Sequence, residues 1–160
     1  MLWLIINIIL CLSASYIIYN TTLSFLGVYL TLKQLILPVA ILGSILFLSK
    51  FIFKSNAIVH TVLIVILCSI LVYLFNHVNF LISIISSLVT TIIITFGSLL
   101  FVCPFYQIIG LNLNNIDFKT IDWVILNIGE LFIPLLVLII NKTFNFSILV
   151  LLFKEIEREE

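Results

Sequence analysis

The stretch FLISIISSLVTTIIITFGSLLFVC, residues 80–103, contains no charged side chain. As an α-helix its 24 residues would rise about 36 Å, which is enough to cross a hydrocarbon core of about 30 Å with some tilt. Its polar side chains are hydroxyls, which can bond to their own helix or to a neighbouring one. The stretch therefore predicts a transmembrane helix, and Pro104, directly after it, is expected to end that helix.

The composition of the whole chain extends this prediction. The 160 residues are 64% hydrophobic and 9% charged, with a mean hydropathy of +1.42, whereas a soluble domain is about half apolar and about a quarter charged. In lipid the backbone must satisfy its own hydrogen bonds, so long apolar runs become helices even when they are rich in Val and Ile. The alternating strands of a transmembrane barrel are not seen in the sequence. We therefore expect an all-α, polytopic transmembrane bundle.

Five apolar runs are long enough to span a bilayer, at residues 2–19, 35–53, 57–75, 80–103 and 123–140. Residues 20–33, which open with Asn20-Thr21-Thr22, are expected to form a linker along the membrane interface. Pro38 would then lie in the first turn of the second span, where its missing N–H costs little. Residues 105–122 form the longest polar connection and predict a loop or short helix packed on the bundle.

The end of the chain has a different character. Asn141-Lys142-Thr143 is expected to end the fifth span, and the apolar run 144–153 is too short to cross alone. We therefore expect residues 1–143 to form the bundle and residues 144–160 to form an amphipathic helix, interfacial or cytoplasmic, with a sixth half-span as the alternative. A slight excess of Lys and Arg at this end favours a cytoplasmic C-terminus.

Small and polar residues recur at helical spacing in four of the five runs. Small residues let helix backbones approach, and hydroxyls and amides bond across helices, so these strips are expected to face the interior. The strips are Asn7, Cys11 and Ser15; Ala40, Gly43 and Ser44; Ser83, Ser87, Thr90, Gly97 and Ser98; and Trp123, Asn127, Glu130, Pro134 and Asn141.

Glu130 is the only acidic residue well inside a predicted span, and an intramembrane carboxylate marks a candidate functional site. In a five-span topology Lys50, His60 and Glu130 fall in the same outer layer of the bilayer. A cation there would keep the carboxylate charged although burial favours its protonated form. We predict that Glu130 pairs with Lys50 or His60 and forms the polar floor of a binding site. The alternative is a protonated Glu130 that bonds to a neighbouring helix.

No catalytic or metal-binding pattern accompanies this cluster. Cys11, Cys68 and Cys103 lie in apolar runs without paired spacing, so no metal and no cofactor is predicted. A membrane peptidase could pair His60 with Cys68, but the residues between them offer no polar helper and burial would disfavour a thiolate. Seven basic and seven acidic residues leave no basic patch for nucleic acid. A non-enzymatic protein is therefore expected.

Several features of residues 30–142 follow one order along the chain. A basic end of the second run is followed by a short connection, and His60-Thr61 opens the third. Pro104-Phe105-Tyr106 and Gly110-Leu111 follow the fourth run, and Asn141-Lys142 closes the fifth. This order resembles the membrane sensor region of accessory-gene-regulator-like histidine kinases of Firmicutes. In those kinases a phosphoacceptor domain and an ATP-binding domain follow, and neither is expected here.

The resemblance implies a bacterial, multi-pass protein of the cell membrane that acts in signal transduction, as signal input or as a small stand-alone relative. Its partners would be the lipid bilayer and a membrane or cytoplasmic protein that docks on the C-terminal helix. Two other functions stay open: a small transport component that binds a solute within the bundle, and an inert assembly or immunity-type protein.

Overall fold

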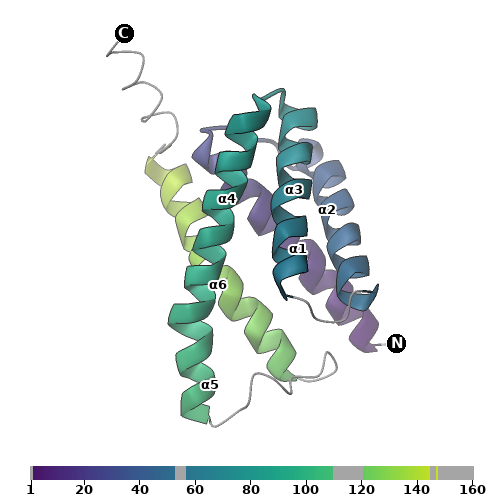
Figure 1. Cartoon of the computed structure of the whole chain (residues 1–160), viewed down its shortest axis with the longest axis vertical. Helices are drawn as coiled ribbons and strands as arrows, with labels where there is room; N and C mark the ends of the chain where they lie inside the picture. The colour runs from purple at the N-terminus through teal and green to yellow at the C-terminus, as the bar shows by residue number, and fades with distance from the viewer. Residues whose placement is uncertain (1, 53–56, 110–120, 145–146, 148–160) are drawn as a thin grey trace.

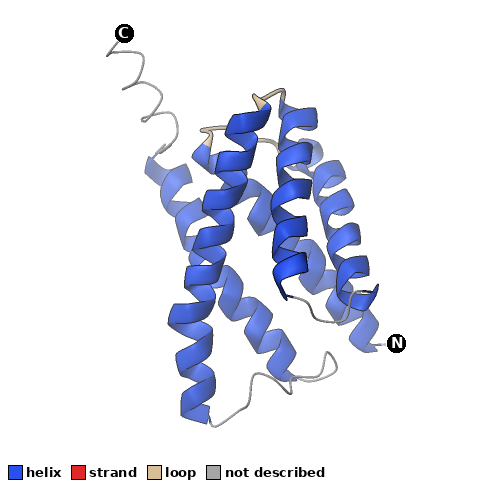
Figure 2. Cartoon of the chain, in the orientation of Figure 1, coloured by secondary structure: helices blue, strands red, loops and turns tan. Residues whose placement is uncertain are grey.

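The computed structural model describes residues 2–52, 57–109, 121–144 and 147. Within these residues the chain is helical and contains no strand (Figure 2). Five of the helices are long and apolar enough to cross a membrane. The predicted all-α bundle of about five spans is therefore confirmed.

The elements follow one another along the chain in simple order. They are α1 (Leu2–Phe25), α2 (Leu32–Ile52), α3 (Ala57–Asn76), α4 (Phe80–Gly97), the π-helical turn η1 (Ser98–Val102), α5 (Cys103–Ile109) and α6 (Ile121–Phe144). The long helices run alternately up and down, and α5 continues the line of α4 (Figure 1). The start of α1 and the end of α6 consequently lie at opposite ends of the bundle, as five spans require.

The central helix of the bundle is α1, which contacts α2, α3, α4 and α6. Among the outer helices, α2 packs on α3, α3 on α4, and α4 on α6. A hydrophobic core fills the space between α1, α2 and α3. It is formed by Ile18, Tyr19, Leu23, Leu35, Val39, Leu42, Leu46, Cys68, Leu71 and Val72.

Polar and apolar residues are distributed as expected for a protein in lipid. Large apolar side chains cover the outer surface, among them Leu37, Ile92 and Ile128, each more than half exposed. Among the described residues, buried polar residues are about as many as buried apolar ones, and all of them are Ser, Thr or Asn. In water this surface would be a continuous apolar patch of a size that soluble monomers avoid. The chain is thus a multi-pass helical membrane protein.

The first helix is longer than predicted, and the expected linker from residue 20 is wrong. Thr21 and Thr22 lie inside α1, fully buried, because their hydroxyls donate to carbonyls one turn back, at 2.8 and 2.9 Å. The helix ends at Phe25, and Gly27, whose φ is 69°, follows as its cap. The Gly27 N–H bonds to the Ser24 carbonyl at 3.1 Å and the Val28 N–H to the Leu23 carbonyl at 3.0 Å, which is a Schellman cap.

The second helix starts three residues before its predicted start. Thr31 is its cap, since the Thr31 N–H donates to Gln34 Oε1 at 3.0 Å and the Gln34 N–H donates to the Thr31 carbonyl at 3.0 Å. The Gln34 side chain thus forms its half of a capping box, and the Thr31 hydroxyl also donates to Gln34 Oε1, at 2.9 Å. Pro38 therefore lies in the second turn of α2 rather than the first. Its missing N–H leaves the Gln34 carbonyl without its usual donor.

The fourth helix does not end at Pro104, contrary to the prediction. The chain passes through η1, where the Cys103 N–H bonds to the Ser98 carbonyl, five residues back. Helix α5 then starts at Cys103, so Pro104 occupies a first turn, where the lack of an N–H is tolerated. The predicted connection 105–122 is correspondingly shortened by α5 and the start of α6. Residues 110–120 lie outside the described residues.

The sixth helix continues through Asn141-Lys142-Thr143, which was wrongly expected to end it. Asn141 is buried, and its Nδ2 donates to Ser24 Oγ at 2.9 Å. The Tyr29 hydroxyl donates to the Asn141 carbonyl at 2.8 Å. Burial raises the pKa of the Tyr29 phenol above its usual value. The predicted C-terminal helix, apart from Phe144 and Ser147, lies outside the described residues.

The predicted inward strips are largely confirmed. Buried members include Asn7, Cys11, Ser15, Gly43, Ser83, Ser87, Thr90, Gly97, Asn127, Pro134 and Asn141. Ser44 is exposed, which corrects one position. Ser86, which was not predicted, is fully buried because its hydroxyl donates to the Thr22 carbonyl at 2.6 Å.

Candidate functional site

The predicted cluster of Glu130, Lys50 and His60 is drawn from three helices. His60 lies in the first turn of α3, where its Nδ1 is 3.0 Å from Ser49 Oγ of α2. Lys50 follows Ser49 in α2, and its side chain lies outside the described part of the structure. The bond between Ser49 and His60 therefore ties the end of α2 to the start of α3, directly beside Lys50 in the chain.

Glu130 lies half-buried in α6, a helix that packs on α1, α4 and η1. His60 belongs to α3, which packs on α1, α2 and α4. The structure thus brings His60 next to the residue that precedes Lys50, and it places Glu130 at another helix pair. The pairing of Glu130 with Lys50 or His60 stays a prediction.

The backbone of Glu130 marks the point where α4 crosses α6. Pro134 has no N–H, so the Glu130 carbonyl lacks its usual donor one turn ahead. A Cβ on Gly97 would lie 3.2 Å from this carbonyl oxygen, and a Cβ on Gly129 would lie 3.0 Å from Val102 Cγ2. The helices can meet this closely because both contact positions are glycine.

This crossing coincides with irregular backbone on both helices. Gly97 ends α4 and is followed at once by the π-turn η1, while Pro134 lies inside α6. Short π-segments in helices occur frequently at functional sites. Glu130 therefore lies where two transmembrane helices both depart from regular hydrogen bonding.

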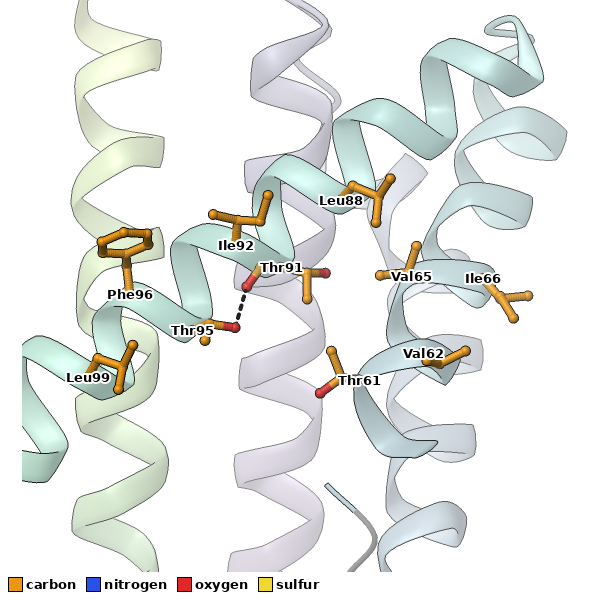
Figure 3. A pocket seen from close by; sticks show the side chains of 10 residues that line it. All are labelled: Thr61, Val62, Val65, Ile66, Leu88, Thr91, Ile92, Thr95, Phe96 and Leu99. Atoms are coloured by element: carbon orange, nitrogen blue, oxygen red, sulfur yellow. Dashed lines mark hydrogen bonds between the residues drawn. The ribbon is translucent and has the colours of Figure 1, made fainter. Parts of the chain in front are cut away.

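A lateral groove between α3 and α4 is the second feature of interest, with a volume of about 450 Å³ (Figure 3). We call it the α3–α4 groove. Its lining is apolar except for three threonines, and its residues are Thr61, Val62, Val65, Ile66, Leu88, Thr91, Ile92, Thr95, Phe96 and Leu99. Most of these side chains are exposed on the outer surface of the bundle. The groove therefore opens sideways, toward lipid.

The threonines give the groove limited polarity. Thr91 Oγ1 donates to the Ser87 carbonyl at 2.9 Å, and Thr95 Oγ1 donates to the Thr91 carbonyl at 3.0 Å. Each of these hydroxyl protons is thus used within α4, and only oxygen lone pairs are left for a ligand. Such a lining suits a ligand that is apolar along most of its length.

Helix α4 presents two opposite faces. One face, which continues into η1, lines the groove with residues at three- and four-residue spacing, from Leu88 of α4 to Leu99 of η1. The opposite face is buried and carries the small residues Ser83, Ser86, Ser87, Thr90 and Gly97. A helix turns 100° per residue, so Gly97 points away from the groove and toward α6. The same helix therefore forms the groove wall and the close contact with Glu130.

Polar side chains in the interior of the bundle form hydrogen bonds between helices. The Thr21 hydroxyl, which donates within α1, also lies 3.2 Å from the Pro134 carbonyl oxygen, so its proton is shared between the two carbonyls. Trp123 Nε1 donates to Asn7 Oδ1 at 2.8 Å. Across the described ranges, every buried side-chain nitrogen and oxygen has a hydrogen-bond partner. These groups hold the bundle together, and their hydrogen bonding within the protein explains their burial without a ligand.

The peptidase reading of His60 and Cys68 gains no support from the geometry. Cys68 is buried, with its Sγ 3.4 Å from Thr22 Oγ1, whereas His60 bonds to Ser49. Eight residues along one helix separate the two by about 12 Å. Among the residues that the structure describes, no group of three or more His, Cys, Asp and Glu side chains could hold a metal ion.

The α3–α4 groove was not predicted. The sequence did contain one signal, since Thr91 and Thr95 form a second polar strip on the face of α4 opposite the buried one. The strip can be recognised as part of a groove only once the structure places Thr61 of α3 across from it.

Comparisons with family models, with curated proteins and with solved structures gave no match to this chain.

Proposed function

We propose that the chain is a non-enzymatic sensory or regulatory module of the cell membrane, and that its input is a hydrophobic ligand that enters the α3–α4 groove from the lipid phase. The observation that carries this proposal is the groove itself: about 450 Å³, apolar, open sideways and lined by the helix that also touches α6. Pockets of this volume are typical of small-molecule sites.

A lateral opening favours sensing over transport. A transported polar solute needs vacant polar groups along a path between the two faces of the bundle. Here the polar groups between α1, α4 and α6 bond to one another. A groove on the outer face instead gives access to molecules already dissolved in the bilayer.

The signal would travel through α4. A ligand in the groove contacts one face of α4, and Gly97 on the opposite face contacts the Glu130 carbonyl of α6. Movement of α4 would then shift α6, which runs to the end of the bundle opposite the start of α3 (Figure 1). Such coupling requires that the ligand bind one arrangement of α4 more tightly than another. The C-terminal side of α6 would deliver the output to a partner protein in the cytoplasm.

Distances between spin labels test this proposal. In a variant whose three native cysteines are replaced by alanine, labels are attached at Ile108→Cys of α5 and Ile9→Cys of α1, two exposed positions. The protein is placed in phosphatidylcholine nanodiscs, with and without a total bacterial lipid extract or a hydrophobic peptide fraction. A shift of the distance distribution with either addition is expected.

An unchanged distribution with both additions contradicts the proposed function. If proteoliposomes then take up solutes in a protein-dependent way, the transport reading replaces it. A matched pair of labels at Ile9 and Ile36, on α1 and α2 away from the groove, should stay unchanged and controls for a general change of packing.

A further inference from the structure

We propose that the α3–α4 groove binds an acyl chain of a membrane lipid that carries a hydroxyl group part-way along its length, and that this hydroxyl donates to a threonine oxygen of α4. The inference rests on the proposed function, because it names the ligand class of the same groove. It follows from the hydrogen bonds that the threonines of α4 make, from their depth in the membrane and from the apolar side chains on either side of them.

The two threonines that α4 contributes to the groove are already used as donors but can still accept a hydrogen bond. Thr91 Oγ1 donates to the Ser87 carbonyl at 2.9 Å, and Thr95 Oγ1 donates to the Thr91 carbonyl at 3.0 Å. A hydroxyl has one proton and two acceptor lone pairs. A ligand with an O–H group therefore finds an acceptor on this wall of the groove, whereas a ligand with only a carbonyl finds no donor on these two threonines.

The accepting oxygens lie where a lipid can reach them. On the buried face of α4, Thr90 Oγ1 is 3.1 Å from Thr22 Oγ1 of α1, so that oxygen is used between helices. Thr95, in contrast, is exposed, and Thr91 is half-buried. Figure 3 shows both on the groove wall, across from Thr61 of α3. A molecule that enters the groove from the side therefore meets the oxygens of Thr91 and Thr95.

The two threonines lie at the depth of the lipid chains. Helix α4 starts at Phe80, whose ring packs edge-on against Tyr73 with the ring centroids 5.7 Å apart, and Tyr is enriched where a helix meets the membrane–water interface. From Phe80 the helix rises about 16 Å to Thr91 and about 22 Å to Thr95, and both distances lie within a hydrocarbon core of about 30 Å. A headgroup does not extend to this depth, so the donor must be carried by the chain itself.

Apolar side chains flank the threonines on both sides along the groove. Leu88 lies one turn before Thr91, and Leu99 lies one turn after Thr95. The ligand should therefore be apolar on both sides of its hydroxyl, as is an acyl chain that is hydroxylated at an internal carbon. From Leu88 to Leu99 the rise is about 16 Å, close to the half-thickness of the hydrocarbon core, about 15 Å. One chain of a single leaflet fits this length.

The walls of the groove suit a flexible chain better than a second helix. Transmembrane helices approach each other through small residues, as α4 and α6 do at Gly97. The described lining of the groove contains no Gly, Ala or Ser and includes branched and aromatic side chains such as Val65, Ile92 and Phe96. A hydrocarbon chain can follow such a surface, whereas a rigid helix would be held away from it.

The surrounding lipid strengthens the selection for a donor. In the bilayer interior no water is present to bond a hydroxyl, and an unsatisfied polar group costs free energy. A hydroxylated chain in the groove replaces that unsatisfied state by a hydrogen bond to a threonine oxygen. It therefore gains more from entering the groove than a plain chain of the same length.

Displacement of a brominated lipid tests the proposal. With Trp3 and Trp123 replaced by Phe, a single tryptophan is placed in the groove by Phe96→Trp, or on the exposed surface of α6 by Phe132→Trp. Each variant is reconstituted in nanodiscs of phosphatidylcholine brominated on the acyl chain, which quenches a tryptophan that it contacts. Part of this lipid is then replaced by phosphatidylcholine with a stearoyl chain that carries a mid-chain hydroxyl, a mid-chain ketone or no substituent. All lipids share one headgroup, so a difference in quenching comes from the chain.

At the groove tryptophan, the hydroxylated chain should displace the brominated lipid about threefold more effectively than the plain chain, the effect of one average hydrogen bond between side chains in a membrane. The ketone chain accepts hydrogen bonds but donates none, so it should behave like the plain chain. At the α6 tryptophan the three chains should be equivalent.

Variants of the threonines identify the acceptor. Thr91→Val combined with Thr95→Val should abolish the preference for the hydroxylated chain, whereas Thr91→Ser combined with Thr95→Ser keeps both hydroxyls and should retain it. The matched control is Thr143→Val. Thr143 is exposed on α6, and its hydroxyl also donates within its own helix, to the Ile139 carbonyl at 2.7 Å. Its replacement should leave the preference unchanged.

Equal displacement by the hydroxylated and plain chains at Phe96→Trp overturns the proposal, as does an equal preference for the ketone chain. A preference that survives Thr91→Val with Thr95→Val, or that is as large at Phe132→Trp, overturns it too, because the threonines of the groove would then not be the acceptors.

The two proposals fail separately. A spin-label shift caused by the lipid extract or the peptide fraction, without a preference for the hydroxylated chain, keeps the sensor and removes this ligand. A clear preference for the hydroxylated chain, without a spin-label shift when that lipid is added, keeps the lipid site and removes the sensor.

Discussion

Oγ1 of Thr22 lies 3.1 Å from Oγ1 of Thr90, and this contact joins the central helix α1 to α4 in the middle of the bundle. The contact is reinforced because Ser86 Oγ donates to the Thr22 carbonyl at 2.6 Å. Cys68 of α3 lies against the same hydroxyl, 3.4 Å away. Three helices therefore meet at one threonine, which has no exposed surface.

Removing the Thr22 hydroxyl should destabilise the bundle modestly. Thr22→Val keeps the shape and the carbonyl that accepts from Ser86, but it loses the side-chain contact with Thr90. We therefore expect the free energy of unfolding to fall by about 1 kcal/mol, between the average of about 0.6 and the maximum of about 1.7 found for hydrogen bonds between membrane helices. The measurement is unfolding in mixed micelles for Thr22→Val, Thr90→Val and the double variant.

The matched control is Thr95→Val, because the Thr95 hydroxyl bonds only within α4 and its side chain is exposed. Its effect should be close to zero. Strict additivity of Thr22→Val and Thr90→Val would show that the two hydroxyls do not interact.

Two glycines at helix contacts should respond differently to alanine. A Cβ at Gly97 meets the Glu130 carbonyl, which is backbone and cannot rotate away, whereas a Cβ at Gly43 meets Leu12 Cδ2 at 2.8 Å, the end of a flexible side chain. Gly97→Ala should therefore cost about 1–3 kcal/mol, the usual range for overpacking. Gly43→Ala should cost clearly less, and Ser44→Ala, on the exposed face, should be neutral.

The same unfolding assay ranks the three variants. An equal cost for Gly97→Ala and Gly43→Ala would mean that α4 and α6 do not cross at Gly97 as closely as the structure indicates.

The chain beyond α6 should still be held on the bundle at Ser147. Ser147 is buried, and its Oγ donates to the Phe25 carbonyl at 2.5 Å. In a variant without native cysteines, a thiol at Ser147→Cys should react with a small maleimide several-fold more slowly than one at the exposed Thr143→Cys. Equal rates at both positions, after correction for a denatured control, would contradict this contact.

The sequence predicted the fold class because hydropathy and run length are local properties. A run without charges, such as 80–103, must form its hydrogen bonds within a helix in lipid, whatever surrounds it. The inward strips were predictable for the same reason, since a period of 3.6 residues puts Asn7, Cys11 and Ser15 on one face.

The helix ends were predicted less well because polarity was given more weight than capping. Asn20-Thr21-Thr22 is polar, yet these threonines satisfy their hydroxyls within α1 and become its most buried part. The sequence did contain the correct boundaries, in Gly27 as the C-cap and in the pattern from Thr31 to Gln34 as the N-cap. In a membrane bundle a hydroxyl is a weaker sign of a loop than a glycine with a capping pattern.

The candidate site depends on which helices pair, and one sequence does not determine that. The sequence pointed to Glu130 as a candidate, but the place of Glu130 beside Gly97 follows from the way α4 crosses α6. The groove likewise exists because α3 and α4 present their apolar faces side by side. Such pairings are set by the fit of distant segments, not by the pattern of either one.

The pairing of Glu130 with Lys50 or His60 can be decided by coupling energies. If the carboxylate interacts with either cation, Glu130→Gln combined with Lys50→Met or with His60→Ala should deviate from additivity by about 0.5–3 kcal/mol in unfolding free energy. Ser49→Ala serves as the control, since it breaks the 3.0 Å bond to His60 Nδ1 and leaves the carboxylate in place. The effect of Ser49→Ala on the unfolding free energy should be non-additive with that of His60→Ala. It should be additive with that of Glu130→Gln. If Glu130→Gln is additive with both Lys50→Met and His60→Ala, then Glu130 pairs with neither residue. Glu130 would then act through the α4–α6 crossing at Gly97 alone.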